Sequence, residues 1–204
     1  MKLPDEQECF RLMDYYCLPQ NIKEHCVLVA KVAKLIAQEH FEKGSNVNVH
    51  LVYYSSLLHD LAKPIEFFDY TELNSECEKI WKDLKKKYNN CRHPEAGYYI
   101  LKDAYPEVAR VIRKHDYMAI VSNDRKEKPV TSEEKIVNYA DKRVSHGEIV
   151  SLRQRFNEGH RRWQKEANYN DWIAEKVDKK YMELEKELFF GISFEPHEIA
   201  GLID

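Results

Sequence analysis

The stretch from Leu51 to Lys63 is the sequence feature that most constrains the fold. It reads LVYYSSLLHDLAK, and its apolar residues recur at the spacing of one helix face. His59 and Asp60 stand side by side near the end of this expected helix. An imidazole and a carboxylate are costly to bury without partners. The fold must therefore supply compensating groups around the pair, and a divalent metal ion suits both kinds of ligand.

The rest of the chain favours an all-α protein. Only six of its 204 residues are glycine and seven are proline, and long segments show helical periodicity. This length predicts a single domain over residues 1–204. Helices are expected over residues 4–17, 21–40, 51–63 and 75–88, from Pro94, from Pro106, after Thr131, and in one or two long segments before Gly191. An extended tail is expected after Gly191.

Several signals set the expected helix boundaries. Asn21 with Glu24, and Thr131 with Glu134, resemble capping boxes at helix starts. Pro94 suits the first helical position, which would make His93 the cap residue. An aromatic loop over residues 64–74 follows the His-Asp pair and could form a wall of a site there, although packing in the core is the favoured role.

Charge and cysteine content narrow the functional classes. The formal net charge of −3 gives no general affinity for nucleic acid or an anionic membrane. The start of the chain lacks the apolar stretch of a signal peptide, and no run is long and apolar enough to span a membrane. Five cysteines without a C-x-x-C motif predict free thiols in a reducing compartment. A cytoplasmic location is therefore expected.

Four more residues of ligand type join the His59-Asp60 pair. His25, His115 and Asp141 lie on the apolar faces of three different expected helices, and His93 stands at the start of a fourth. Any one of them alone is more commonly a hydrogen-bonded core or surface residue than a metal ligand. Together they predict a metal site of imidazoles and carboxylates.

The order and local context of these residues resemble a known family. His25, then His59-Asp60, then Asp141 is similar to the signature of the HD-domain phosphohydrolase superfamily, and the surrounding words EH, LHDLAK and YADKR match as well. The resemblance covers about residues 20–157, and the helices over about 158–190 lie outside it. It implies an HD-domain-like helical bundle, and the apolar pattern of the C-terminal helices indicates additional packing elements.

The resemblance also implies roles for these residues. His93 and His115 are similar to the extra ligands of members that bind two metal ions. In such members His25, His59, Asp60 and Asp141 would hold one ion, and Asp60 would bridge to a second ion held by His93 and His115. The donor types favour Fe, Mn, Co, Ni or Zn. Two ions about 3.5–4 Å apart would activate a water and neutralise a phosphate group.

Three basic residues are candidates for binding the substrate. Lys63 follows His59 by one helical turn, and in similar proteins a lysine at this place contacts the substrate phosphate. Lys142 and Arg143 follow Asp141 and could also reach an anion. Helix geometry places Arg143 about 200° around from Asp141, which favours a surface role for it. Asp60 and Lys63 are the expected catalytic residues.

The expected function is hydrolysis of a phosphate ester or anhydride of a small nucleotide-like substrate by a metal-activated water. The layout resembles the small two-metal group that includes diadenosine tetraphosphate hydrolases, while the Gly-Tyr-Pro motif of cyclic-dinucleotide phosphodiesterases is absent. Three alternatives remain open: a mononuclear nucleoside monophosphatase, a non-catalytic metal or nucleotide sensor, and a helical adaptor whose histidines are only structural.

Overall fold

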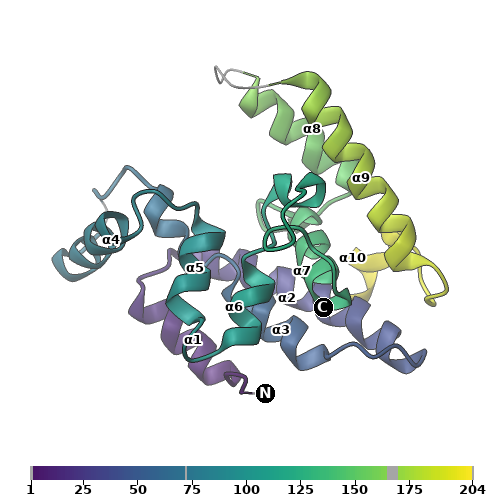
Figure 1. The fold of residues 1–204 in the computed structure, drawn as a ribbon, viewed down its shortest axis with the longest axis horizontal. Helices are drawn as coiled ribbons and strands as arrows, with labels where there is room; N and C mark the ends of the chain where they lie inside the picture. The colour runs from purple at the N-terminus through teal and green to yellow at the C-terminus, as the bar shows by residue number, and fades with distance from the viewer. Residues whose placement is uncertain (1, 72, 165–169, 204) are drawn as a thin grey trace.

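The computed structural model describes residues 2–71, 73–164 and 170–203 (Figure 1). It confirms the all-α prediction: apart from a two-stranded hairpin, its regular elements are helices. In chain order they are α1 (Glu6–Tyr15), α2 (Gln20–Glu42), α3 (Val49–Leu58), η1 (Lys63–Glu66), α4 (Ser75–Lys87), α5 (His93–Leu101), α6 (Pro106–Ile112), η2 (Tyr117–Val121), α7 (Ser132–Lys142), β1 (Val144–Ser145), β2 (Glu148–Ile149), α8 (Leu152–Trp163), α9 (Asp171–Phe189), η3 (Pro196–Glu198) and α10 (Ile199–Leu202).

The core forms where α2, α3, α6 and α7 meet (Figure 1). Each of these helices presents fully buried aliphatic side chains to the others, including Val29, Leu57, Ile112 and Ile136. Helix α3 is apolar around most of its circumference and is surrounded by protein, as a helix without a polar face must be. The residues that follow α3 therefore begin inside the molecule.

The helix boundaries agree with some cap predictions and overturn others. Thr131 and Glu134 make both hydrogen bonds of the capping box that starts α7, as predicted. The predicted box at Asn21 is wrong, because α2 starts one residue earlier and its cap, Pro19, has no side chain that can accept a hydrogen bond. Helix α5 starts at His93 itself, so Arg92 is its cap residue.

A tight hairpin joins α7 to α8. Val144 pairs with Ile149 and Ser145 with Glu148 in antiparallel register. The two residues between them, His146 and Gly147, have φ values of 51° and 79°. Two successive positive φ values are what a two-residue hairpin turn requires. The bend expected at His146-Gly147 is therefore this turn, and it reverses the chain directly after Asp141 and Lys142.

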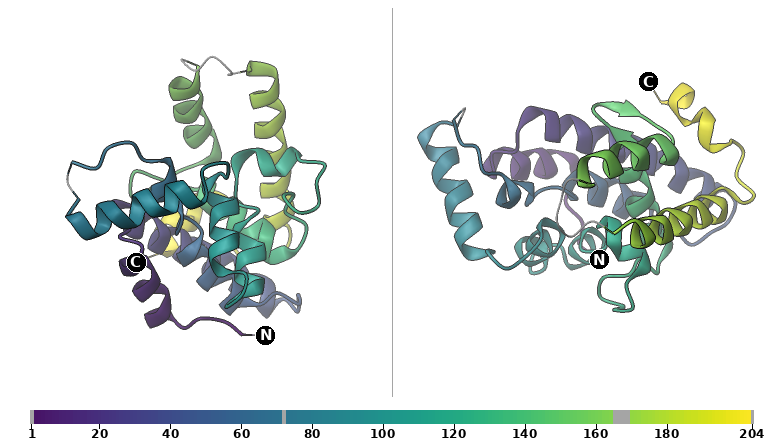
Figure 2. Two further views of the ribbon diagram at one scale, coloured as in Figure 1. Left: turned by 60° about the vertical axis from the view of Figure 1, so that its left-hand side comes forward. Right: turned by 90° about the horizontal axis from the view of Figure 1, so that it is seen from above.

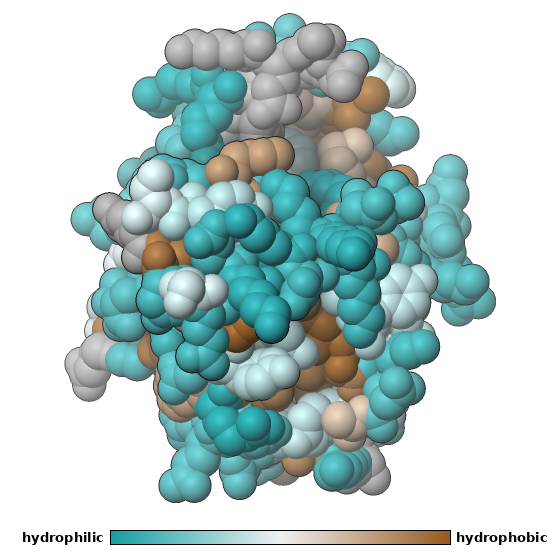
Figure 3. Space-filling model, turned by 90° about the vertical axis from the view of Figure 1, so that its left-hand side faces the viewer, coloured by the Kyte–Doolittle hydropathy of each residue, from teal (hydrophilic) through white to brown (hydrophobic). Residues whose placement is uncertain are grey.

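Helix α4 lies at one edge of the molecule, away from α8 and α9 (Figures 1 and 2). The face on this side is mostly hydrophilic (Figure 3), in keeping with the Lys85–Lys87 run at the end of α4. A disulfide between Cys17 and Cys77 ties α4 to the α1–α2 connection. The prediction that all five cysteines are free is thus wrong for these two. Sequence spacing could not reveal the pair, because 60 residues separate its members.

The aromatic loop packs mainly against α4. Ile65 is buried, and the Phe67 ring lies 5.3 Å from that of Trp81. Phe68 is 84% exposed, and the Lys85 ammonium lies 3.8 Å from its ring centroid. None of these side chains lines the cavity at the His-Asp pair. These side chains therefore pack, which was the role favoured from the sequence, and they do not form a wall of the cavity.

Helices α8 and α9 form an antiparallel pair that rises from the body (Figures 1 and 2). Tyr117 links α9 to the body, since its hydroxyl donates to Asp178 at 2.6 Å. After Gly191 the chain forms η3 and α10, so the extended tail expected there is wrong. Within residues 2–71, 73–164 and 170–203, no helix has the length and apolar character needed to cross a membrane.

Candidate metal centre

The fold brings all six sequence-predicted ligands to one place. They come from α2 (His25), the turn directly after α3 (His59 and Asp60), the start of α5 (His93), the segment after α6 (His115) and α7 (Asp141). All are buried except His25, which is half-buried. Two sets of three have ligand atoms within 4.8 Å of one another: His25, His59 and Asp141, and His59, Asp60 and His115.

The imidazoles are oriented by the backbone. His59 Nδ1 donates to the Ser56 carbonyl at 2.7 Å, and His115 Nδ1 donates to the Ile112 carbonyl at 2.6 Å. A carbonyl can only accept, so Nδ1 carries a proton, and it is Nε2 that offers a lone pair when the ring is neutral. This is the usual way in which a protein fixes the tautomer of a metal-binding histidine.

His59 gives the clearest sign that something is needed at the centre. Its Nε2 is buried and has no hydrogen-bond partner within the described parts of the chain. The nearest carboxylate oxygens lie at 3.5 Å on Asp141 and 3.8 Å on Asp60, beyond good hydrogen-bonding distance. Buried polar atoms are rarely left unpaired. A cation bound by the Nε2 lone pair would satisfy this atom.

Asp60 faces different imidazoles with its two oxygens. Oδ2 lies 3.8 Å from His59 Nε2, whereas Oδ1 lies 3.0 Å from His93 Nε2 and 3.5 Å from His115 Nε2. The Nε2 atoms of His93 and His115 are themselves 2.9 Å apart. On the other side, His25 Nε2 lies 3.1 Å from Asp141 Oδ1. Asp60 therefore stands between two groups of nitrogen donors.

Burial and neighbouring charges shift the pKa values of several groups at this centre. Burial opposes the charge of Asp60, but the imidazoles of His59 and His93 outweigh it and hold the pKa of this carboxyl well below its usual range. Burial likewise opposes the charge of Asp141, and the Lys142 ammonium with the His25 imidazole keeps its pKa well below normal. Burial lowers the pKa of His115 to about 4, so this ring is neutral at pH 7.

Glu66 completes the centre and was missed by the sequence analysis. Its carboxylate accepts hydrogen bonds from the Nδ1 and the backbone N–H of His93, at 2.7 and 3.2 Å. Burial opposes its charge, but these bonds and the Lys63 ammonium lower its pKa to about 2. A carboxylate behind a histidine orients the ring and raises the basicity of its free nitrogen. Its position in the loop after Pro64 gave no periodic signal.

Lys63 and Lys142 both line the cavity but have different partners. The Lys63 ammonium lies 3.3 Å from Glu66, and burial tends to lower its pKa, but Asp60 and Glu66 raise it overall. The Lys142 ammonium forms an ion pair with Asp141 and donates to the His115 carbonyl at 2.9 Å. Lys142 thus holds Asp141 in place, while Lys63 presents a positive charge to the cavity.

Arg143 does not line the cavity, so the structure does not support its expected substrate-binding role. Its guanidinium is buried and donates to the Val150 and Pro196 carbonyls at 2.6 and 2.8 Å, and to the hydroxyl of Tyr139. The expected surface position is wrong. The α7–α8 hairpin and the C-terminal segment cover this side of α7, and the helix pattern alone could not show that.

Five of the six residues line a cavity of about 280 Å³, and His59 is fully buried behind them. Helix α8, expected only to pack, contributes Arg155, Phe156 and Arg162 to its wall. Arg92 and Tyr117 complete the opposite side. The cavity is thus lined by the carboxylates of Asp60 and Asp141 and by five cationic side chains: Lys63, Arg92, Lys142, Arg155 and Arg162. Such an arrangement attracts an anion, such as a phosphate, whose oxygens can also bind a metal ion.

Comparison with known proteins agrees with this geometry. A family model described as HD domain matches residues 22–144, which is more than half of the chain. The chain belongs to the HD domain family. Comparisons with curated proteins and with solved structures returned no match. The HD family is one of metal-dependent phosphohydrolases, and its members bind divalent metals. The family resemblance predicted from the sequence is therefore confirmed.

Proposed function

We propose that this HD domain protein hydrolyses a phosphate ester or anhydride of a small nucleotide-like substrate at a centre of two divalent transition-metal ions. The observation that carries the proposal is the position of Asp60, whose Oδ2 faces His59 and whose Oδ1 faces His93 and His115, while His59 Nε2 remains buried and unpaired within the described chain. Such a carboxylate is suited to bridging two cations. When bound, the ions would lower the pKa of a water and neutralise phosphate charge.

The protein's own residues would divide the remaining work. His25, His59, Asp60 and Asp141 would hold one ion, and Asp60, His93 and His115 the other. Glu66 and Lys142 orient His93 and Asp141 through the contacts described above. The Lys63 ammonium, fixed beside Glu66, would hold a phosphate oxygen over the centre. Nitrogen and oxygen donors without thiolate favour Fe, Mn, Co, Ni or Zn.

Metal content is the first test of this proposal. We expect about two ions per chain by elemental analysis, about one in His115→Ala, and loss of both metal binding and hydrolysis in Asp60→Ala. Hydrolysis would be screened with nucleoside mono-, di- and triphosphates and dinucleoside polyphosphates. Undiminished turnover by Asp60→Ala would refute the mechanism. One ion that His115→Ala leaves in place would instead indicate the mononuclear alternative.

Lys63 provides a second test that separates phosphate binding from metal binding. Lys63→Ala should retain the metal and raise KM or lower kcat. Lys23→Ala is the matched control, because Lys23 pairs with the exposed Asp14 and does not line the cavity. Loss of metal in Lys63→Ala would mean that this lysine supports the ligands and does not bind the substrate.

A further inference from the structure

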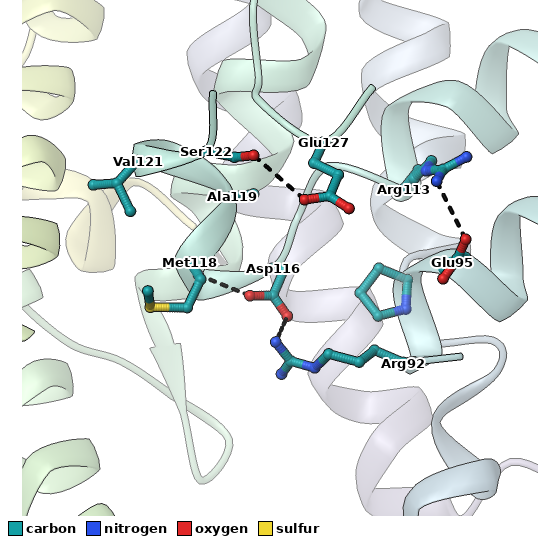
Figure 4. Close-up of a pocket in the computed structure, with 10 residues that line it drawn as sticks. Arg92, Glu95, Arg113, Asp116, Met118, Ala119, Val121, Ser122 and Glu127 are labelled. Carbon is teal, nitrogen blue, oxygen red and sulfur yellow. Dashed lines mark hydrogen bonds and ion pairs between the residues drawn. The ribbon is translucent and has the colours of Figure 1, made fainter. Parts of the chain in front are cut away.

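A second pocket opens beside the metal cavity (Figure 4). It has a volume of about 410 Å³ and lies between the start of α5 and the segment from Asp116 to Glu127. Arg92 and Asp116 line both this pocket and the metal cavity, and they form an ion pair with each other. The two spaces are therefore neighbours, separated by one pair of side chains.

The lining of this second pocket combines flat apolar surface with polar groups at its edges. Pro94, Met118 and Val121 supply apolar contact area. Arg113 lines one side, and its Nε atom is buried without a hydrogen-bond partner in the described chain. Glu127 lies on another side, where its carboxylate accepts a hydrogen bond from Ser122 at 3.3 Å (Figure 4).

We infer that this pocket binds the nucleoside part of the substrate while its phosphate lies at the metal centre. The inference rests on the proposed hydrolase function and names the part of the substrate that this pocket would hold. A volume of this size lies in the usual range for small-molecule sites. A nucleobase has apolar faces and a polar edge, which match Met118 and Val121 on one hand and Arg113 and Glu127 on the other.

Other groups fit this lining less well. A plain sugar would leave the surface of Pro94, Met118 and Val121 without an apolar partner. An alkyl chain would offer no polar edge to the Glu127 carboxylate or to the Arg113 guanidinium, whose pairing within the pocket is with Ser122 and Glu95 respectively. Arg92 stands at the boundary of the two spaces, where the link between phosphate and nucleoside would pass. Its side chain is 66% exposed, so it has room to move toward an anion.

The test uses nucleosides, which lack phosphate and need neither metal nor turnover. Binding of adenosine, guanosine, cytidine and uridine to the full chain would be measured by saturation-transfer NMR and titration. Val121→Trp should weaken the binding of the preferred nucleoside at least tenfold. Val130→Trp, an exposed position outside the pocket, should not change it. Met118→Trp, at a more exposed lining position, repeats the test if Val121→Trp does not fold.

The outcomes separate this inference from the proposed hydrolysis. Failure of all four nucleosides to bind, or equal binding by wild type and both pocket variants, would overturn the inference. In an active preparation, kcat/KM would be measured for the best nucleotide and for p-nitrophenyl phosphate, which has no nucleoside. Val121→Trp should lower the ratio of the first value to the second at least tenfold. Nucleoside binding that is lost in the pocket variants would support the pocket even if neither phosphate compound were hydrolysed.

Discussion

Replacing Gly97 with alanine tests the packing that sets the distance between His93 and His115. Gly97 lies in α5, and a Cβ added to it would stand 3.0 Å from Cδ1 of Ile112 in α6. Ile112 is fully buried, so this methyl group cannot move into solvent. Because His93 begins α5 and His115 follows α6, their Nε2 separation of 2.9 Å depends on this helix contact.

The magnitude follows from two opposing terms. Alanine in a helix interior is more stable than glycine by about 1 kcal/mol. Overpacking a core costs about 1–3 kcal/mol, so Gly97→Ala should lower the free energy of unfolding by between zero and about 2 kcal/mol. Ile112→Val removes the Cδ1 atom, and the next atoms lie at 3.9 and 4.0 Å. In that background Gly97→Ala should instead raise the free energy of unfolding by about 1 kcal/mol.

The assay is a double-mutant cycle by urea unfolding, followed by circular dichroism. We expect a coupling energy of about 1–3 kcal/mol between the two substitutions. Gly201→Ala is the matched control, because a Cβ there meets nothing within 4 Å, and it should show no coupling to Ile112→Val. Additive effects of Gly97→Ala and Ile112→Val, within about 0.3 kcal/mol, would refute the packing argument.

Three further predictions concern other parts of the chain. Cys77→Ser should lower the free energy of unfolding by up to about 4 kcal/mol under oxidising conditions, because the Cys17–Cys77 disulfide closes a loop of 60 residues in the unfolded chain. A reductant should therefore destabilise the wild type but not the variant, and an unfolding midpoint of the wild type that does not change with reductant would contradict this. Glu66→Gln should weaken metal binding about 10–100-fold in calorimetric titrations without unfolding the protein, because the carboxylate that orients His93 is lost. An unchanged metal affinity would show that Glu66 does not position His93. Arg143→Met should lower the free energy of unfolding by about 3 kcal/mol, because the Val150 and Pro196 carbonyls lose their donor. KM should stay within twofold of wild type, and a large rise in KM would indicate that Arg143 binds the substrate.

The ligand set was accessible from the sequence because each ligand lies in a local pattern. His115 and Asp141 share helical stripes with aliphatic residues, and the His59-Asp60 pair follows an apolar helix. These patterns report burial, and a buried imidazole or carboxylate needs a partner. Glu66 was not accessible in this way, because it ends η1, and a helix of four residues is too short to show a periodic pattern.

The sequence by itself indicated the helical class, the family and the six residues that the fold brings together, since periodicity, residue type and short motifs are local properties of the chain. Only the tertiary structure decided which charges face that centre. It turned Arg143 toward the Val150 and Pro196 carbonyls and brought Arg155 of α8 to the cavity wall. It also paired Cys17 with Cys77. These outcomes depend on contacts between segments far apart in the chain, and no local pattern encodes them.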